Sequence, residues 1–167
     1  AGGASPAPDE GGAEPRAAGR VWKKVRRNLL FWQAARDTVQ VSVFAPPVEP
    51  GQTVRLSVFL HTPEAADSVR TLSRAFHHDA ELVGTGCLAR EFAHGSALAV
   101  HVSVANAAIS KARLDFEWRG QPHKLAFDLY IPWECTGGRS PGVVSVGQKD
   151  VRVGKIEFAL TVLPRRA

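Results

Sequence analysis

A segment near the end of the chain alternates apolar and polar residues on both sides of a turn. In residues 140–162, SPGVVSVGQKDVRVGKIEFALTV, the alternation runs through two stretches that flank Gly147, Lys149 and Asp150. Successive side chains of a β-strand point to opposite faces of the sheet. The pattern therefore predicts two antiparallel strands with one buried face, which is typical of a β-sandwich.

The same alternation recurs upstream in residues 39–60, VQVSVFAPPVEPGQTVRLSVFL, on both sides of Pro50-Gly51. The apolar residues that share a face before and after this turn are Val39, Val41, Val43, Val54, Leu56 and Val58. Further segments of strand character, each bounded by Gly, Asn or Pro, are residues 85–92, 97–104, 111–118 and 124–131. We therefore predict an all-β, immunoglobulin-like Greek-key sandwich of about eight strands.

One segment of different periodicity interrupts the strands after residue 61. Thr62 suits the N-cap of a helix, and Pro63 suits its first turn. The apolar residues that then recur on one helical face are Ala65, Val69, Leu72 and Phe76. We expect a single inserted helix that lies across an open end or edge of the sandwich.

The positive charge of the chain lies outside the predicted sandwich. The chain has 21 Lys and Arg against 16 Asp and Glu, a formal net charge of +5, whereas residues 37–163 hold 12 basic and 13 acidic residues, a charge of −1. The excess cations occur in residues 16–36 and at Arg165 and Arg166. Electrostatic recruitment of a partner is therefore expected from the flanks and not from the sandwich.

Composition divides the chain into four segments. Residues 1–19 contain no large side chain that could be buried, so we expect a disordered linker. In residues 20–36, apolar side chains at three- and four-residue spacing are interleaved with cations, which predicts a basic amphipathic helix. Residues 37–163 are expected to form the sandwich domain, and residues 164–167 a tail.

The basic segment supplies the candidate interaction residues of the sequence. They are Trp22, Lys23, Lys24, Arg26, Arg27 and Trp32. The favoured interpretation is that the aromatic face packs on the sandwich or docks on a partner protein, while the cations face water. Two alternatives stay open: weak, salt-dependent contact with an anionic membrane, and, less favoured, contact with a nucleic acid backbone.

The chain has two cysteines, Cys87 and Cys135, and no N-terminal pattern typical of an export signal. Both features favour a reducing cytoplasm, with free and partly buried thiols in preference to a disulfide. No apolar run approaches the roughly 20 residues that a membrane-spanning helix needs. We therefore expect a cytoplasmic location.

No pattern of catalytic, metal-binding or cofactor-binding residues is recognisable in the sequence. The histidines lack the spacing of a metal site, and structural roles are favoured for them. Cys135 and Ser140 lie in an expected loop, but no base can be assigned to either. Trp118 could stack on a ligand beside Arg119, but the alternation makes it the last core residue of its strand. We expect no enzymatic activity, no cofactor and no metal.

Several phrases of the sequence resemble one known family. VSVFAPP and PGQTVRLSVFLH, a helix that begins with Pro-Glu, then LDFEWRGQPHKLAFDLYIP and PGVVSVGQKDVRVGKIEFALTV look like the β-sandwich domain of bacterial Toll/interleukin receptor (TIR) proteins. The resemblance spans residues 39–162, and FAPP, FLH, WRG and GKIEFALTV carry it. The chain departs from the family in ECTGGRS, between Trp133 and Pro141, which looks longer and contains Cys135.

The resemblance implies a sandwich that accompanies a signalling or effector domain of a bacterial defence protein. This chain contains no TIR domain, so the NAD cleavage of that domain maps to no residue here. We predict a non-enzymatic protein-interaction or regulatory domain that controls assembly or partner recognition of an effector outside this chain. The alternatives are a module that binds a peptide, nucleotide or glycan near Trp118, Arg119 and Trp133, and association with a membrane surface.

Overall fold

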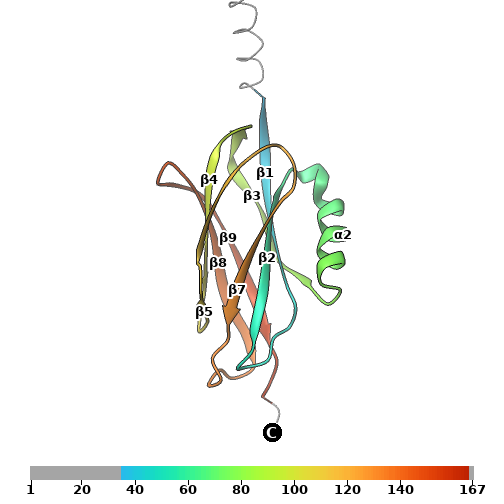
Figure 1. Ribbon diagram of the computed structural model, residues 1–167, viewed down its shortest axis with the longest axis vertical. Coiled ribbons are helices and arrows are strands. Elements are labelled where there is room, and N and C mark those ends of the chain that lie inside the picture. Colours follow the sequence, from blue (N-terminus) through green and yellow to red (C-terminus); the bar gives the residue numbers. More distant parts are fainter. Residues whose placement is uncertain (1–34, 166–167) are drawn as a thin grey trace, which may run out of the picture. The chain divides into compact units, whose positions relative to one another are not determined.

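The computed structural model describes residues 35–165, which form nine strands, one α-helix and a short 3-10 helix (Figure 1). In chain order the elements are β1 (Arg36–Ala45), β2 (Thr53–His61), η2 (Pro63–Ala65), α2 (Ala66–Phe76), β3 (Glu81–Ala93), β4 (Ala97–Val104), β5 (Ala108–Ile109), β6 (Arg113–Glu117), β7 (His123–Tyr130), β8 (Gly138–Gln148) and β9 (Val151–Val162). The predicted linker, nearly all of the predicted basic helix and the end of the tail lie outside the described residues. The six candidate interaction residues between Trp22 and Trp32 lie outside them as well.

The strands form two antiparallel sheets. Sheet A has the strand order β3-β1-β2-β7-β5, and sheet B has the order β6-β4-β8-β9. β1 and β2 are sequence neighbours, as are β8 and β9, whereas β2 pairs with β7 and β4 pairs with β8 over long stretches of chain. The prediction of an all-β, two-sheet fold with one inserted helix is confirmed. The ninth strand, beyond the expected eight, is the two-residue β5.

The core lies between the two sheets and contains the residues that the alternation assigned to it. The six apolar residues of the first predicted hairpin are all buried, at 5% exposure or less. Trp118 is fully buried just after β6, so its predicted place in the core is confirmed. Removing these side chains from water supplies the main driving force for joining the sheets.

The sandwich is closed on one side by β3 and β9, which belong to different sheets. A Cβ on Gly84 of β3 would lie 2.5 Å from the Cβ of Phe158 and 2.9 Å from the carbonyl oxygen of Glu157 on β9. Real Cβ atoms do not approach other atoms so closely, so only glycine permits this packing. The two sheets therefore meet along this side with almost no space between their backbones.

On the opposite side of the sandwich, β6 and β7 are not paired as strands, although the rings of Phe116 on β6 and His123 on β7 are stacked with 4.6 Å between their centres. β6 is an edge strand of sheet B. β7 pairs with β2 along its whole length but with β5 only at Leu129 and Tyr130. Among residues 35–165, the stretch 123–128 therefore has no strand partner on the side away from β2.

Helix α2 covers the outer face of sheet A (Figure 1), and not an open end or edge as we expected from the sequence. It packs there through Val69, which is buried against Phe44 of β1 and Phe59 of β2. The expected apolar face is only partly buried, because Leu72 and Phe76 are 42% and 59% exposed. The edge-to-face ring pair of Phe44 and Phe59 is a small contact surface, so one buried turn of the helix covers it.

The helical segment begins where the sequence predicted, but its cap differs. Pro63 opens the first turn as expected. Thr62 occupies the N-cap position without a side-chain capping hydrogen bond, and its carbonyl oxygen accepts hydrogen bonds from His61 Nδ1 and from the backbone N–H of Ala65.

Within residues 35–165, no helix has the length and apolar character needed to cross a bilayer.

Candidate functional site

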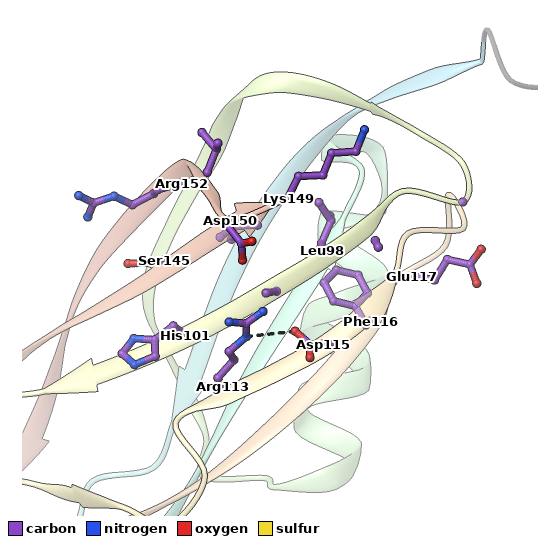
Figure 2. A pocket seen from close by; sticks show the side chains of 16 residues that line it. Leu98, His101, Arg113, Asp115, Phe116, Glu117, Ser145, Lys149, Asp150 and Arg152 are labelled. Carbon is purple, nitrogen blue, oxygen red and sulfur yellow. Dashed lines mark hydrogen bonds and ion pairs between the residues drawn. The ribbon is translucent and has the colours of Figure 1, made fainter.

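A trough crosses the outer face of sheet B (Figure 2). It has a volume of about 940 Å³ and is lined by β4, β6, β8, the turn between β8 and β9, and the first residues of β9. The cross-strand register explains how these elements meet, because Asp115, Ala99, Gly147 and Arg152 are successive neighbours in one row across the sheet. We call this surface the sheet B trough.

Small residues form the floor of the trough. Ala97 and Ala99 point outward from β4, and Gly147 contributes only backbone from β8. The alternation of β4 and β8 places their large apolar side chains on the opposite, core-facing side. Because the floor lacks long side chains, another polypeptide could bring its own backbone close to the sheet.

Charged side chains form the two rims of the trough (Figure 2). On β6, Arg113 and Asp115 form an ion pair, with 3.2 Å between Nε and Oδ1. On the opposite rim, Lys149 and Arg152 lie on either side of Asp150, and neither has an ion-pair partner among residues 35–165. This second rim can therefore receive an anionic group without breaking an existing pair.

The turn that carries the second rim has a specific backbone conformation. Gln148 pairs with Val151, and the two residues between them, Lys149 and Asp150, have positive φ angles of 50° and 62°. Positive φ at both central residues defines a type I′ turn, whose twist matches that of the flanking strands. The predicted turn is confirmed, and it holds Lys149 beside the floor of the trough.

The three residues proposed as a ligand platform are not arranged as one. Trp118 is fully buried, so its ring faces cannot stack on a ligand. Arg119 forms an ion pair with Glu117, at 3.0 Å. Trp133 lies in the loop after β7, where the guanidinium of Arg165 stacks 4.4 Å from the ring centre.

The residues considered for chemistry have no catalytic partners in the described part of the chain. The thiol of Cys135 donates a hydrogen bond to the carbonyl oxygen of Asn106 at 3.4 Å, and both Cys135 and Cys87 are free thiols. Neither Cys135 nor Ser140 is hydrogen-bonded to a histidine or a carboxylate there. Within residues 35–165, no three His, Cys, Asp or Glu side chains are grouped as metal ligands.

One polar pair was missed by the sequence reasoning. Ser42 Oγ lies 2.8 Å from Nε2 of His61, and Nδ1 of the same ring donates to the carbonyl oxygen of Thr62 at 2.7 Å. This orientation is that of a serine and its general base. Ser42 and His61 are buried, however, which denies a substrate access. Ser42 and His61 occupy outward positions of alternating strands, where polar residues are ordinary, so nothing in the sequence distinguishes this pair.

A second polar cluster fixes the start of β1. Asp37 Oδ2 accepts a hydrogen bond from Nε1 of Trp118 at 3.1 Å and lies 2.7 Å from Nε2 of His94. Gly120 makes room for it, since a Cβ there would lie 2.5 Å from the His94 ring nitrogen. The tryptophan and glycine of the WRG phrase therefore have structural roles.

Comparisons with known proteins supply no relationship: no family model and no curated protein matches the chain. The sheet B trough combines a small-residue floor, which permits close contact, with a rim on which two cations, Lys149 and Arg152, outnumber the carboxylate of Asp150 between them. Such a surface is suited to recognition of an extended chain.

Proposed function

We propose that this protein is a non-enzymatic interaction domain that recognises an extended, acidic segment of a partner protein in the sheet B trough. The observation that carries the proposal is the concave outer face itself, where Ala97, Ala99 and Gly147 form an open floor beside Lys149 and Arg152. A bound peptide would lie along the floor and place its carboxylates on Lys149 and on Arg152, which lie on either side of Asp150.

Other classes of ligand fit this surface less well. Glycans stack on exposed aromatic rings, whereas Phe116 on β6 is half-buried, packs against the core beside Leu98 and is stacked on His123. Nucleic acids need a strongly basic surface, whereas residues 37–163 have a charge of −1. Membrane contact through the basic segment stays an alternative, which rests on residues outside the described part of the chain.

The biological role that we propose follows the resemblance to the TIR-associated β-sandwich domain. In this proposal the domain is immunoglobulin-like with Greek-key connections, which the pairing of β2 with β7 and of β4 with β8 supports. It works in the bacterial cytoplasm, a setting consistent with free Cys87 and Cys135. Partner binding in the trough then controls the assembly of an effector outside this chain.

The test uses the full chain as bait for a displayed library of short random peptides. We expect enrichment of peptides rich in Asp and Glu, with affinities that fall at least tenfold in Ala99→Trp, because an indole would fill the trough. Ser103→Trp is the matched control, since Ser103 is exposed on the same strand outside the trough. It should bind the selected peptides like the unmodified chain.

A second pair of variants tests the charge of the rim. Lys149→Glu combined with Arg152→Glu should abolish binding of the acidic peptides, because the introduced carboxylates repel them. Lys155→Glu, on β9 and outside the trough, should leave binding within about twofold. The proposal is wrong if no peptide is enriched, or if the selected peptides bind Ala99→Trp as tightly as the unmodified chain.

A further inference from the structure

The free edge of β7 has few of the features that normally prevent strand edges from pairing. Such edges are often protected by bulges, prolines, inward-pointing charges or lysines, and of these the free stretch carries one lysine, Lys124. The register between β2 and β7 is continuous without a bulge from His123 to Tyr130. The core-facing residues of the free stretch, Leu125 and Phe127, are apolar and buried. The stretch is therefore a regular template for one more antiparallel strand.

The sequence of this edge is complementary to itself. If β7 pairs with a second β7 in antiparallel fashion about Ala126, then Lys124 of each copy lies opposite Asp128 of the other. Leu125 of each copy then lies opposite Phe127, and the two Ala126 residues face each other. Opposite charges and paired apolar residues on facing strands stabilise a sheet, and small residues at the centre avoid a clash.

We propose that two copies of this chain dimerise by pairing their β7 edges about a two-fold axis at Ala126, which joins the two A sheets into one continuous sheet. The interface is isologous, as in most homodimers. It fits between Pro122, which lacks an N–H, and Leu129, where β5 begins to cover the edge. The inference deepens the proposed function, and its role in effector assembly rests on that function.

The surroundings of Lys124 also favour a carboxylate from a second copy. Its ammonium lies 3.5 Å from the ring centre of Phe76, which is exposed on α2. Burial and the nearby Arg55 lower the pKa of Lys124. Asp128 already bonds Arg55 at 3.1 Å within its own chain, and Lys124 has no ion-pair partner in the described part of the chain, so a second copy's Asp128 would supply a counter-ion.

The other open edge is less suited to the same pairing. A two-fold axis at the middle of β6 would place Asp115 opposite its own copy, and like charges directly opposite each other destabilise a strand pair. β3 and β9 are also edge strands, but they pack closely on each other at Gly84 and Phe158, which hinders the approach of another strand. Among the described strands, β7 is therefore the edge that fits a second copy.

The first test is the mass of the full chain by light scattering over a concentration series. We expect a shift from 18.0 kDa towards twice that value as the concentration rises. Lys124→Asp and Asp128→Lys should each weaken dimerisation at least tenfold, because each places like charges opposite one another. An equimolar mixture of these two variants should restore the dimer, since every facing pair is then opposite in charge. Lys155→Asp, on β9, is the control and should dimerise normally.

A disulfide between copies tests the register. In a background of Cys87→Ser and Cys135→Ser, oxidised Ala126→Cys should cross-link, because directly opposite Cα atoms lie about 4.5–5.5 Å apart, within reach of a disulfide. The oxidised Lys124→Cys variant should not cross-link, because position 124 of one copy lies about 14 Å along the strands from position 124 of the other. Circular dichroism checks that each variant is folded before its cross-linking is measured.

The outcomes separate this inference from the proposed function. A chain that is monomeric at all concentrations, or a dimer that survives both charge reversals, overturns pairing through β7. If acidic peptides still bind the sheet B trough in that case, the proposed function stands without the dimer. If the dimer forms and the trough binds no peptide, the pairing stands and the proposed function falls.

Discussion

His61 is fully buried at the end of β2, yet both of its ring nitrogens have partners. Nδ1 donates to the carbonyl oxygen of Thr62 at 2.7 Å, and Nε2 accepts from the hydroxyl of Ser42 at 2.8 Å. Ser42 Oγ also lies 3.3 Å from the hydroxyl of Thr85 on β3. A ring with these two hydrogen bonds is neutral. Burial lowers the pKa of His61, and the hydrogen bond to the Thr62 carbonyl raises it by a smaller amount.

This neutral histidine makes a prediction for stability against pH. The folded pKa of His61 lies below its unfolded value of about 6.5, so between the two values the unfolded chain binds more protons. The contribution of His61 to the free energy of unfolding should therefore be constant above about pH 6.5. As the pH falls below about 6.5, this contribution should decrease by at most about 1.4 kcal/mol per pH unit. Urea unfolding at a series of pH values measures this slope.

The variant His61→Gln isolates the contribution of this ring. Its unfolding free energy should be lower at neutral pH, because the buried hydrogen bonds are disturbed, but it should fall less steeply as the pH is lowered. Burial also lowers the pKa of His123, so His123→Gln is the matched control and should keep the part of the slope that belongs to His61. An equally steep fall in His61→Gln would contradict a neutral, buried His61.

Helix α2 illustrates what an element's sequence can and cannot predict. Helical spacing and Pro63 were sufficient to predict the segment and its first turn. Of the predicted apolar face, Val69 is fully buried, but Leu72 and Phe76 are exposed, and Ser73 is buried instead. Periodicity identifies an apolar stripe, but the position of the helix on the sheet is decided by the residues beneath it. Here those are aromatic side chains of β1 and β2.

The buried position of Ser73 in α2 predicts a stabilising substitution. Its hydroxyl is the buried side-chain polar atom without a hydrogen-bond partner among the described residues. A buried hydroxyl without a partner costs about 1–3 kcal/mol, so Ser73→Ala should raise the free energy of unfolding by at least about 1 kcal/mol. Denaturant unfolding checks the value.

Ser68→Ala is the matched control for this substitution. Ser68 is exposed in the same helix, so replacing it adds only the higher helix propensity of alanine, about 0.5 kcal/mol. The difference between the two variants is then the cost of the buried hydroxyl. If Ser73→Ala gains no more than Ser68→Ala, the hydroxyl has a partner and the interpretation is wrong.

At the scale of the whole molecule, the alternation predicted two sheets and their inner faces but not the order of the strands. The sheet B trough exists because β6, β4, β8 and β9 are neighbours, which brings Ala99 and Gly147 together from distant parts of the sequence. A period of two residues assigns each side chain to a face and says nothing about the adjacent strand. For the same reason the sequence predicted β7 as a strand without identifying its free edge.

The close approach of β3 and β9 is the whole-molecule feature with the sharpest consequence for stability. Gly84→Ala would place a Cβ against the backbone and Cβ of β9, so the two sheets must move apart or β3 must shift. Overpacking of this kind costs about 1–3 kcal/mol. We expect a loss of about 2–3 kcal/mol in the free energy of unfolding, because the clashing atoms belong to two backbones that cannot turn aside.

The control is Gly147→Ala on β8, where the nearest atom to the new Cβ would be 3.4 Å away, an ordinary contact. Its free energy of unfolding should change by no more than about 0.5 kcal/mol. Guanidinium unfolding of both variants measures the difference directly. Equal midpoints would mean that β3 and β9 tolerate a side chain between them, and that the sandwich is held closed by the core between its sheets without this backbone contact.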